Sequence, residues 1–115
     1  MHLVRKDLAP PYEAPGHSDM FMRRLQGREA GPSESVWLGL SVIQPGGGTT
    51  LSASAAEKFY VVVEGELEIT AEQDGSVRTE VLRPLDSCRI APDEPRRLFN
   101  RGDQPATVLL VMPIR

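Results

Sequence analysis

Apolar residues occur along this chain in short runs that glycine and proline residues interrupt. The run 66–71 alternates polar and apolar residues, as a strand with one face in water does. Asp74–Gly75 is a strong signal for a two-residue hairpin turn between that run and the next one. The runs predicted as strands are 20–25, 36–43, 58–63, 66–71, 77–82, 87–91, 96–100 and 106–112. No run has the periodicity of an amphipathic helix, so we expect an all-β fold of about eight to ten short strands.

The connecting segments divide the chain into an arm and a body. Residues 7–19 contain three prolines and no apolar periodicity, which predicts an extended arm or loop. The segment 45–48 is one proline followed by three glycines, and we expect it to end the strand before it. We therefore expect one domain over 1–115, with an N-terminal arm and edge strands in 1–35 and a barrel in 36–115.

Composition and charge exclude several classes of protein. The chain has 115 residues and a net charge of −3, whereas a nucleic-acid-binding protein needs a basic field. The longest apolar run, Phe59–Val63, is far too short to cross a bilayer, and the N-terminus lacks the apolar stretch of a secretion signal. Cys88 is the only cysteine, which excludes an internal disulfide and fits a reducing compartment. We expect a cytoplasmic protein with no nucleic-acid or membrane partner.

Two ordered groups of residues resemble the motifs of the cupin family. Pro45-Gly46-Gly47, followed after a loop by the sequence from Phe59 to Ile69 with Gly65 inside it, resembles the first motif. The residues that resemble the second motif are Leu85-Asp86, Ile90-Ala91-Pro92, Pro95-Arg96, Asn100 and Gly102-Asp103-Gln104-Pro105. The resemblance covers about residues 38 to 112. It implies a double-stranded β-helix, or jelly-roll barrel, that is usually a homodimer and holds a ligand pocket inside.

The resemblance also implies where a metal would bind. In typical cupins the pocket holds a divalent metal on three histidines and a glutamate. Counting back from Gly65 puts the glutamate position on Lys58 and two histidine positions on Ser52 and Ser54, and the third histidine position falls on Arg96. Hydroxyl groups are poor metal donors, and ammonium and guanidinium groups have no lone pair to offer. The metal site is therefore degenerate, and we expect no metal cofactor.

The same replacements predict a cationic pocket. Ser52, Ser54, Lys58 and Tyr60 all have even numbers, so an unbroken strand would point them to one face. If that face is inward, these residues and Arg96 present two cations, two hydroxyls and a phenol to a ligand. Arginine forms forked, charge-assisted hydrogen bonds with carboxylates and phosphates. We therefore predict that these five residues bind a small anion that carries a carboxylate.

Two alternatives remain for this position in the sequence. A bulge at Ala55–Ala56 could turn Glu57 inward in place of Lys58, because one residue of slip reverses every side chain. A metal could also be bound by other donors, with His17, Cys88 and Glu57 as the candidates.

Three functions are compatible with this pocket, and whether the protein is an enzyme stays open. The first is a module that binds a small anionic metabolite in a metal-free barrel and leaves it unchanged. The second is a metal-independent isomerase, lyase or decarboxylase acting on a small organic acid. Lys58 and Arg96 would then hold the carboxylate, Lys58 could instead serve as a base or Schiff-base amine, and Tyr60 or His17 would move the proton. The third is a metal-dependent cupin enzyme with atypical ligands.

Overall fold

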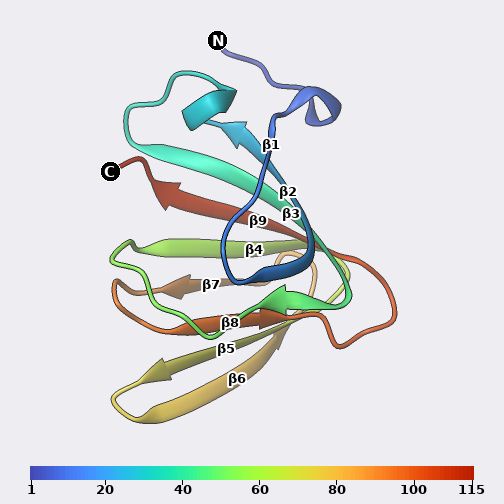
Figure 1. Cartoon of the computed structure of the whole chain (residues 1–115), viewed down its shortest axis with the longest axis vertical. Coiled ribbons are helices and arrows are strands. Elements are labelled where there is room, and N and C mark those ends of the chain that lie inside the picture. The colour runs from blue at the N-terminus through green and yellow to red at the C-terminus, as the bar shows by residue number, and fades with distance from the viewer.

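The computed structural model describes all 115 residues and contains nine strands (Figure 1). The strands are β1 (Pro11–Tyr12), β2 (His17–Gln26), β3 (Val36–Thr49), β4 (Lys58–Glu64), β5 (Leu67–Gln73), β6 (Ser76–Leu82), β7 (Ser87–Ile90), β8 (Arg96–Phe99) and β9 (Ala106–Pro113). They form one sheet in the order β6-β5-β8-β3-β9-β4-β7, with β2 added beside β3 and β1 beside β2. Every strand pair is antiparallel. The prediction of an all-β jelly-roll barrel is confirmed, and the barrel stays open between β6 and β7.

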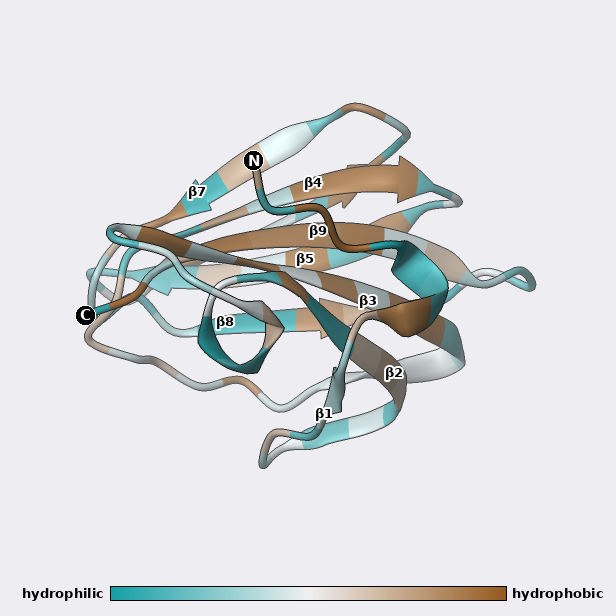
Figure 2. Cartoon of the chain, turned by 90° about the horizontal axis from the view of Figure 1, so that it is seen from above, coloured by the Kyte–Doolittle hydropathy of each residue, from teal (hydrophilic) through white to brown (hydrophobic).

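The core lies inside the curved sheet and follows the period of two that strands impose. Inward positions of β4, β5, β8 and β9 are buried, whereas many of the residues between them are at least partly exposed. Figure 2 shows that β4 and β9 carry mostly hydrophobic residues along their length. The largest fully buried apolar side chains are Ile43, Leu67, Val62 and Val108. The interior also contains two buried charged residues, Lys58 of β4 and Arg96 of β8.

The predicted hairpin turn is present. Asp74 and Gly75 both have positive φ, 51° and 78°, as a two-residue hairpin turn with the twist of the flanking strands requires. β5 and β6 pair from Gln73 with Ser76 to Leu67 with Leu82. The local sequence therefore sets this register.

Two expectations about the connecting segments are wrong. The strand that was expected to end before Pro45 continues to Thr49, because the backbone of Gly46 and Gly47 hydrogen-bonds to Asn100 at distances of 2.8 and 3.0 Å. Residues 7–19 are not only a loop, since they contain β1 and the start of β2, where His17 pairs with Thr49. In both segments, pairing with a distant part of the chain overrides the local effect of proline and glycine.

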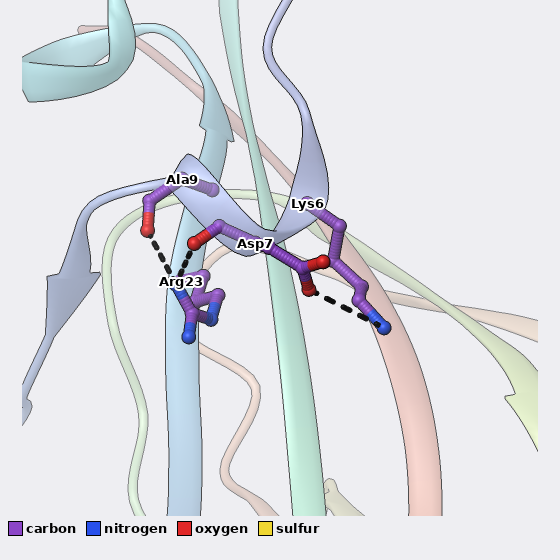
Figure 3. Close-up of polar contacts among 4 residues, drawn as sticks. All are labelled: Lys6, Asp7, Ala9 and Arg23. Atoms are coloured by element: carbon purple, nitrogen blue, oxygen red, sulfur yellow. Dashed lines mark hydrogen bonds and ion pairs between the residues drawn. The ribbon is translucent and has the colours of Figure 1, made fainter.

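The N-terminal arm folds back on its own chain. Its short 3₁₀ turn, η1 (Lys6–Leu8), is held by Arg23 of β2 (Figure 3). Nη1 of Arg23 donates hydrogen bonds to the carbonyl oxygens of Ala9 at 2.8 Å and Asp7 at 3.5 Å. A second 3₁₀ turn, η2 (Arg28–Ala30), follows β2. No helical segment of the structure has both the length and the hydropathy needed to span a membrane.

Candidate ligand-binding site in the barrel interior

Strand β4 points Lys58 and Tyr60 into the barrel. Lys58 is only 4% exposed, and Tyr60 belongs to the hydrophobic core cluster. Glu57 precedes the strand and forms an ion pair at 2.5 Å with Arg89 of β7, where both side chains are about half exposed. The structure has no bulge that turns Glu57 inward, so lysine occupies the interior at this position.

Arg96 of β8 meets Tyr60 across the interior. Arg96 is 7% exposed, and its Nε donates a hydrogen bond to Tyr60 Oη at 2.8 Å. Its Nη1 donates to Thr49 Oγ1 at 3.3 Å, Ser52 Oγ at 3.2 Å and the Thr50 carbonyl at 3.5 Å. All of these acceptors are neutral. Nη2 has no hydrogen-bond partner within the chain, which leaves a donor for a ligand.

Of the two predicted serines, Ser52 contacts Arg96 and Ser54 does not. Residues 50–57 leave the regular strand, and only Ser52 keeps a bridge, which pairs it with Arg96. Ser54 lies in the loop, where its hydroxyl contacts the backbone of Ala56. The premise of an unbroken strand from Ser52 to Lys58 is therefore wrong. Within this loop the Ser52 hydroxyl accepts a hydrogen bond from Arg96, whereas the Ser54 hydroxyl contacts only the backbone of Ala56.

The interior cluster of Lys58, Arg96 and Tyr60 carries positive charge with no carboxylate beside it. Neither Lys58 nor Arg96 belongs to any of the six ion pairs of the structure. Burial lowers the pKa of Lys58, and the nearby charge of Arg96 lowers it further. Burial raises the pKa of Tyr60, although Arg96 opposes that rise. The phenol is therefore neutral near pH 7 and can donate a proton or a hydrogen bond.

His17 lies at the edge of this cluster, because β2 begins there and pairs it with Thr49. Burial lowers the pKa of His17, a hydrogen bond to Pro15 partly reverses the change, and the charges of Arg96 and Lys58 lower the pKa again. Its Nδ1 lies 2.8 Å from the Pro15 carbonyl oxygen. Since a carbonyl only accepts, Nδ1 carries the proton, and Nε2 is the free, basic nitrogen.

Tyr12 is a further residue near the interior, and its place there was not predictable from the sequence. It lies close enough to Tyr60 for the two phenols to affect each other, and burial raises its pKa. Its position depends on Gly39 of β3, where an added Cβ would lie 3.0 Å from Tyr12 Oη and 2.9 Å from Cζ3 of Trp37. A glycine on an inward position of a long strand is the only sequence signal for this approach.

The residues of the four metal positions do not fit a divalent metal. Such a metal needs several imidazole, thiolate or carboxylate donors, and this cluster offers ammonium, guanidinium and hydroxyl groups. The structure contains no group of three or more histidine, cysteine, aspartate or glutamate side chains that could hold a metal ion. The alternative donors do not converge, because Glu57 pairs with Arg89 while Cys88 points inward beside Tyr60. We derive no metal-dependent step for this site.

Comparisons with known proteins give a consistent picture. The family model described as Cupin domain matches residues 39–112. A relative in Mycobacterium tuberculosis, Beta-D-galactosidase Rv1717, is 44% identical over 112 residues, which is 97% of this chain and 93% of that protein.

Solved structures share the fold. The polyketide cyclase RemF from Streptomyces resistomycificus superposes with a TM-score of 0.85 at 23% identity, over 100% of this chain and 80% of that one. A sugar phosphate isomerase of the cupin superfamily from Silicibacter pomeroyi gives a TM-score of 0.76 at 24% identity, over 96% and 74% of the two chains. These structural likenesses establish the architecture and leave the chemistry to the side chains.

Proposed function

Because the chain belongs to the cupin family, we propose that its barrel binds a small anionic metabolite through Lys58 and Arg96. The carboxylate or phosphate of the ligand would take the place that a metal takes in typical cupins. The observation that carries this proposal is the pair of buried cations without any carboxylate partner. A buried charge without a counterion is costly, and an anionic ligand would remove that cost.

The partners of Arg96 support binding by orienting the side chain. Tyr60, Thr49 and Ser52 occupy Nε and Nη1, so the guanidinium is held in one direction before a ligand arrives. Preorganised donors lose little conformational entropy on binding. Nη2 and the Lys58 ammonium then supply donors that point to the same interior.

A thermal-shift series with three related sugars tests this proposal. The probes are D-galacturonate, D-galactose 6-phosphate and neutral D-galactose, which differ chiefly in the anionic group. We expect one or both anions to raise the melting temperature, because a ligand that binds only the folded state stabilises it. Lys58→Met and Arg96→Gln should each abolish the increase.

Arg83→Gln is the matched control, because Arg83 is an exposed cation outside the interior cluster and pairs with Glu66. It should retain the increase in melting temperature. Equal stabilisation by neutral galactose, or stabilisation by the anions that survives Lys58→Met, would contradict the proposal.

A second candidate function is hydrolysis of β-D-galactosides. It is favoured by the 44% identity to Beta-D-galactosidase Rv1717 across 97% of the chain. Glycoside hydrolysis normally uses two carboxyl groups, and the interior cluster has none. Four carboxyl groups line a neighbouring cavity, Asp74, Glu80, Asp86 and Glu94, and Glu80 and Glu94 are the two glutamates among them.

Turnover of a nitrophenyl β-D-galactopyranoside measures this activity directly. Hydrolysis that is lost in both Glu80→Gln and Glu94→Gln and kept in Arg83→Gln, outside the cavity, would establish it. Absence of turnover, with anion binding present, would leave the binding function.

Proton transfer on an organic acid, with Tyr60 or His17 as the acid or base, can be tested with the anionic sugars of the thermal-shift series. Exchange of a carbon-bound proton of the ligand in D₂O would show this activity.

We also propose that the protein is a cytoplasmic homodimer. The outer face of the sheet carries apolar side chains in register on β2, β3, β9 and β4, among them Phe21, Leu40, Leu109 and Phe59. Phe21 is 50% exposed and Phe59 is 40% exposed. Light scattering should give the mass of a dimer, and Phe59→Glu should give a monomer, whereas Val77→Glu on β6 should not. A monomeric wild-type protein would contradict this proposal.

A further inference from the structure

A large cavity opens between β6 and β7, the two ends of the strand order. It has a volume of about 880 Å³ and is lined by residues of β5, β6 and β7. Six of its 15 lining residues are hydrophobic, and the buried part of the lining is apolar: Ile69, Leu82 and Ile90, with Ala71 and Cys88 beside them. The other lining residues are polar or charged, with the exception of Val81. The cavity exists because β6 and β7, the ends of the sheet, do not pair with each other.

This cavity adjoins the cationic cluster. Ile90 pairs with Lys58 and Cys88 pairs with Tyr60 across the β7–β4 ladder. Paired residues point to the same face of a sheet, and adjacent strands lie about 4.8 Å apart. Lys58 and Tyr60 therefore lie one strand away from the cavity lining and face the same interior.

The charges around the cavity do not favour an anion there. Its lining contains two arginines and four carboxylates: Arg78, Arg89, Asp74, Glu80, Asp86 and Glu94. An anionic group is repelled by this excess of carboxylates and attracted by the unpaired cations of the cluster. The anionic end of a ligand would therefore lie at Lys58 and Arg96, and the rest of the ligand would lie in the cavity.

The volume and lining of the cavity define what that remainder is. Ligand pockets commonly have about 300 to 1,000 Å³ and are predominantly apolar. A carboxylate or phosphate alone leaves such a space filled with water against aliphatic side chains. An apolar body would displace this water and gain roughly 0.8 kcal/mol for each buried methylene group.

We propose that the ligand is amphipathic: an acid whose carboxylate or phosphate binds Lys58 and Arg96, and whose alkyl or aryl body occupies the cavity between β6 and β7. This inference rests on the proposed anion site and adds the class of molecule that carries the anion. It involves no chemical step.

A homologous series of acids tests the inference by isothermal titration calorimetry. Acetate, butyrate, hexanoate and octanoate carry one carboxylate and bodies of increasing length. We expect affinity to rise about fourfold per added methylene group from butyrate onward, which corresponds to about 0.8 kcal/mol each. Lys58→Met should weaken binding of every member.

Leu82→Trp separates the body site from the anion site. Leu82 lines the cavity and pairs with Leu67, away from Arg96, so the larger side chain should remove the chain-length dependence while acetate binding stays within twofold of wild type. Val77→Trp is the matched control, because Val77 lies on the same strand, is 64% exposed and does not line the cavity. It should retain the full dependence.

Alkylation of Cys88 by N-ethylmaleimide provides a measurement on the unmodified chain. This thiol is the only one in the sequence and lines the cavity. At equal occupancy, octanoate should protect it from alkylation and acetate should not. Acids that bind with equal affinity at every length, and leave Cys88 equally reactive, would overturn the inference and leave the anion site intact. Failure of both these acids and the sugar anions to bind would instead overturn the proposed function.

Discussion

Two arginines that are mostly removed from solvent occupy different environments in this barrel. Arg24 of β2 has a side chain that is 16% exposed, and its Nε lies 2.7 Å from a carboxylate oxygen of Glu29. Its guanidinium lies over the rings of Tyr12 at 3.8 Å and Trp37 at 4.1 Å. Arg24 therefore has a counterion and two aromatic faces within its own chain.

Arg96 has neither of these. Its contacts are the hydroxyls of Tyr60, Thr49 and Ser52 and one carbonyl, and the charge of Lys58 nearby makes the local charge more positive. Hydroxyls orient a guanidinium but do not neutralise it. The difference fits the proposal that Arg96 and Lys58 bind an anionic ligand, whereas Arg24 has its charge partner within the fold.

Replacing each arginine by leucine should affect the stability of the fold very differently at the two positions. Arg24→Leu should lower the free energy of unfolding by about 3 kcal/mol, because it removes an ion pair and two cation–π contacts from a mostly buried position. Arg96→Leu should lower it by less than about 1 kcal/mol, because losing an uncompensated buried charge offsets the lost hydrogen bonds.

Urea unfolding measures both values. Arg83→Leu is the control, since its ion pair with Glu66 is well exposed and should contribute about 0.5 kcal/mol or less. Equal losses for Arg24→Leu and Arg96→Leu would mean that both arginines are structural, and the comparison would fail.

The fold was largely predictable from the sequence, because it depends on patterns that are local. The alternation in β5 and the Asp74–Gly75 turn fix one hairpin without help from the rest of the chain. The course of β3 beyond Pro45 was not predictable, because it depends on hydrogen bonds from Asn100, which follows more than fifty residues later. Strand ends that are set by distant partners leave no local signal.

The candidate site also combines residues whose position is predictable from the sequence with residues whose position depends on distant pairing. The spacing from Gly65 placed Lys58 at a key position, and the period of two makes its direction a matter of register alone. The loop at Ser54 depends on backbone hydrogen bonds to Asp93 and Arg96. The approach of Tyr12 and His17 depends on the pairing of β1 with β2 and of β2 with β3. The sequence names these residues, but only the pairing determines which of them reach the cluster.

Lys58→Met removes the other interior cation that has no counterion. At pH 7 the unliganded variant should be more stable than wild type by about 1 to 2 kcal/mol, because a buried charge is replaced by an apolar side chain of similar length. The folded-state pKa of Lys58 lies below its ordinary value of 10.5. The cost of its charge is therefore fully present below the folded pKa and is lost as the pH rises toward 10.5.

The stability advantage of Lys58→Met should accordingly shrink between those two pKa values. Urea unfolding at a series of pH values from 7 to 10.5 records it. A variant that is less stable than wild type at pH 7 would show that Lys58 has a counterion in solution.

Gly39→Ala disturbs the Arg24 side of the comparison without changing any charge. The new Cβ would meet Trp37 and Tyr12 at about 3 Å, so the aromatic rings around Arg24 must move. We expect a loss of about 1 kcal/mol, net of the gain that alanine usually brings over glycine in a strand. The emission of Trp37, the only tryptophan, should change as well.

Ligand binding reports whether the two regions are separate. Gly39→Ala should bind galacturonate or galactose 6-phosphate as wild type does, because Arg96 and Lys58 keep their contacts. Stability above that of wild type with unchanged emission would show that Gly39 makes no room for Tyr12.

The charge of Lys58 should also have a small effect on the pKa of His17. Burial is the largest cause of the lowered pKa of His17, and the hydrogen bond to Pro15 opposes it. The charges of Arg96 and Lys58 lower this pKa further. Lys58→Met should therefore raise the pKa of His17, whereas Arg89→Gln should leave it unchanged, because Arg89 faces outward toward Glu57. Titration of the imidazole proton signals by NMR resolves this change. Since the folded-state pKa lies below 6.5, wild-type stability should fall as the pH drops below 6.5, and it should fall less in Lys58→Met. An unchanged pKa in Lys58→Met would place the ammonium too far from His17 for the two to act on one ligand.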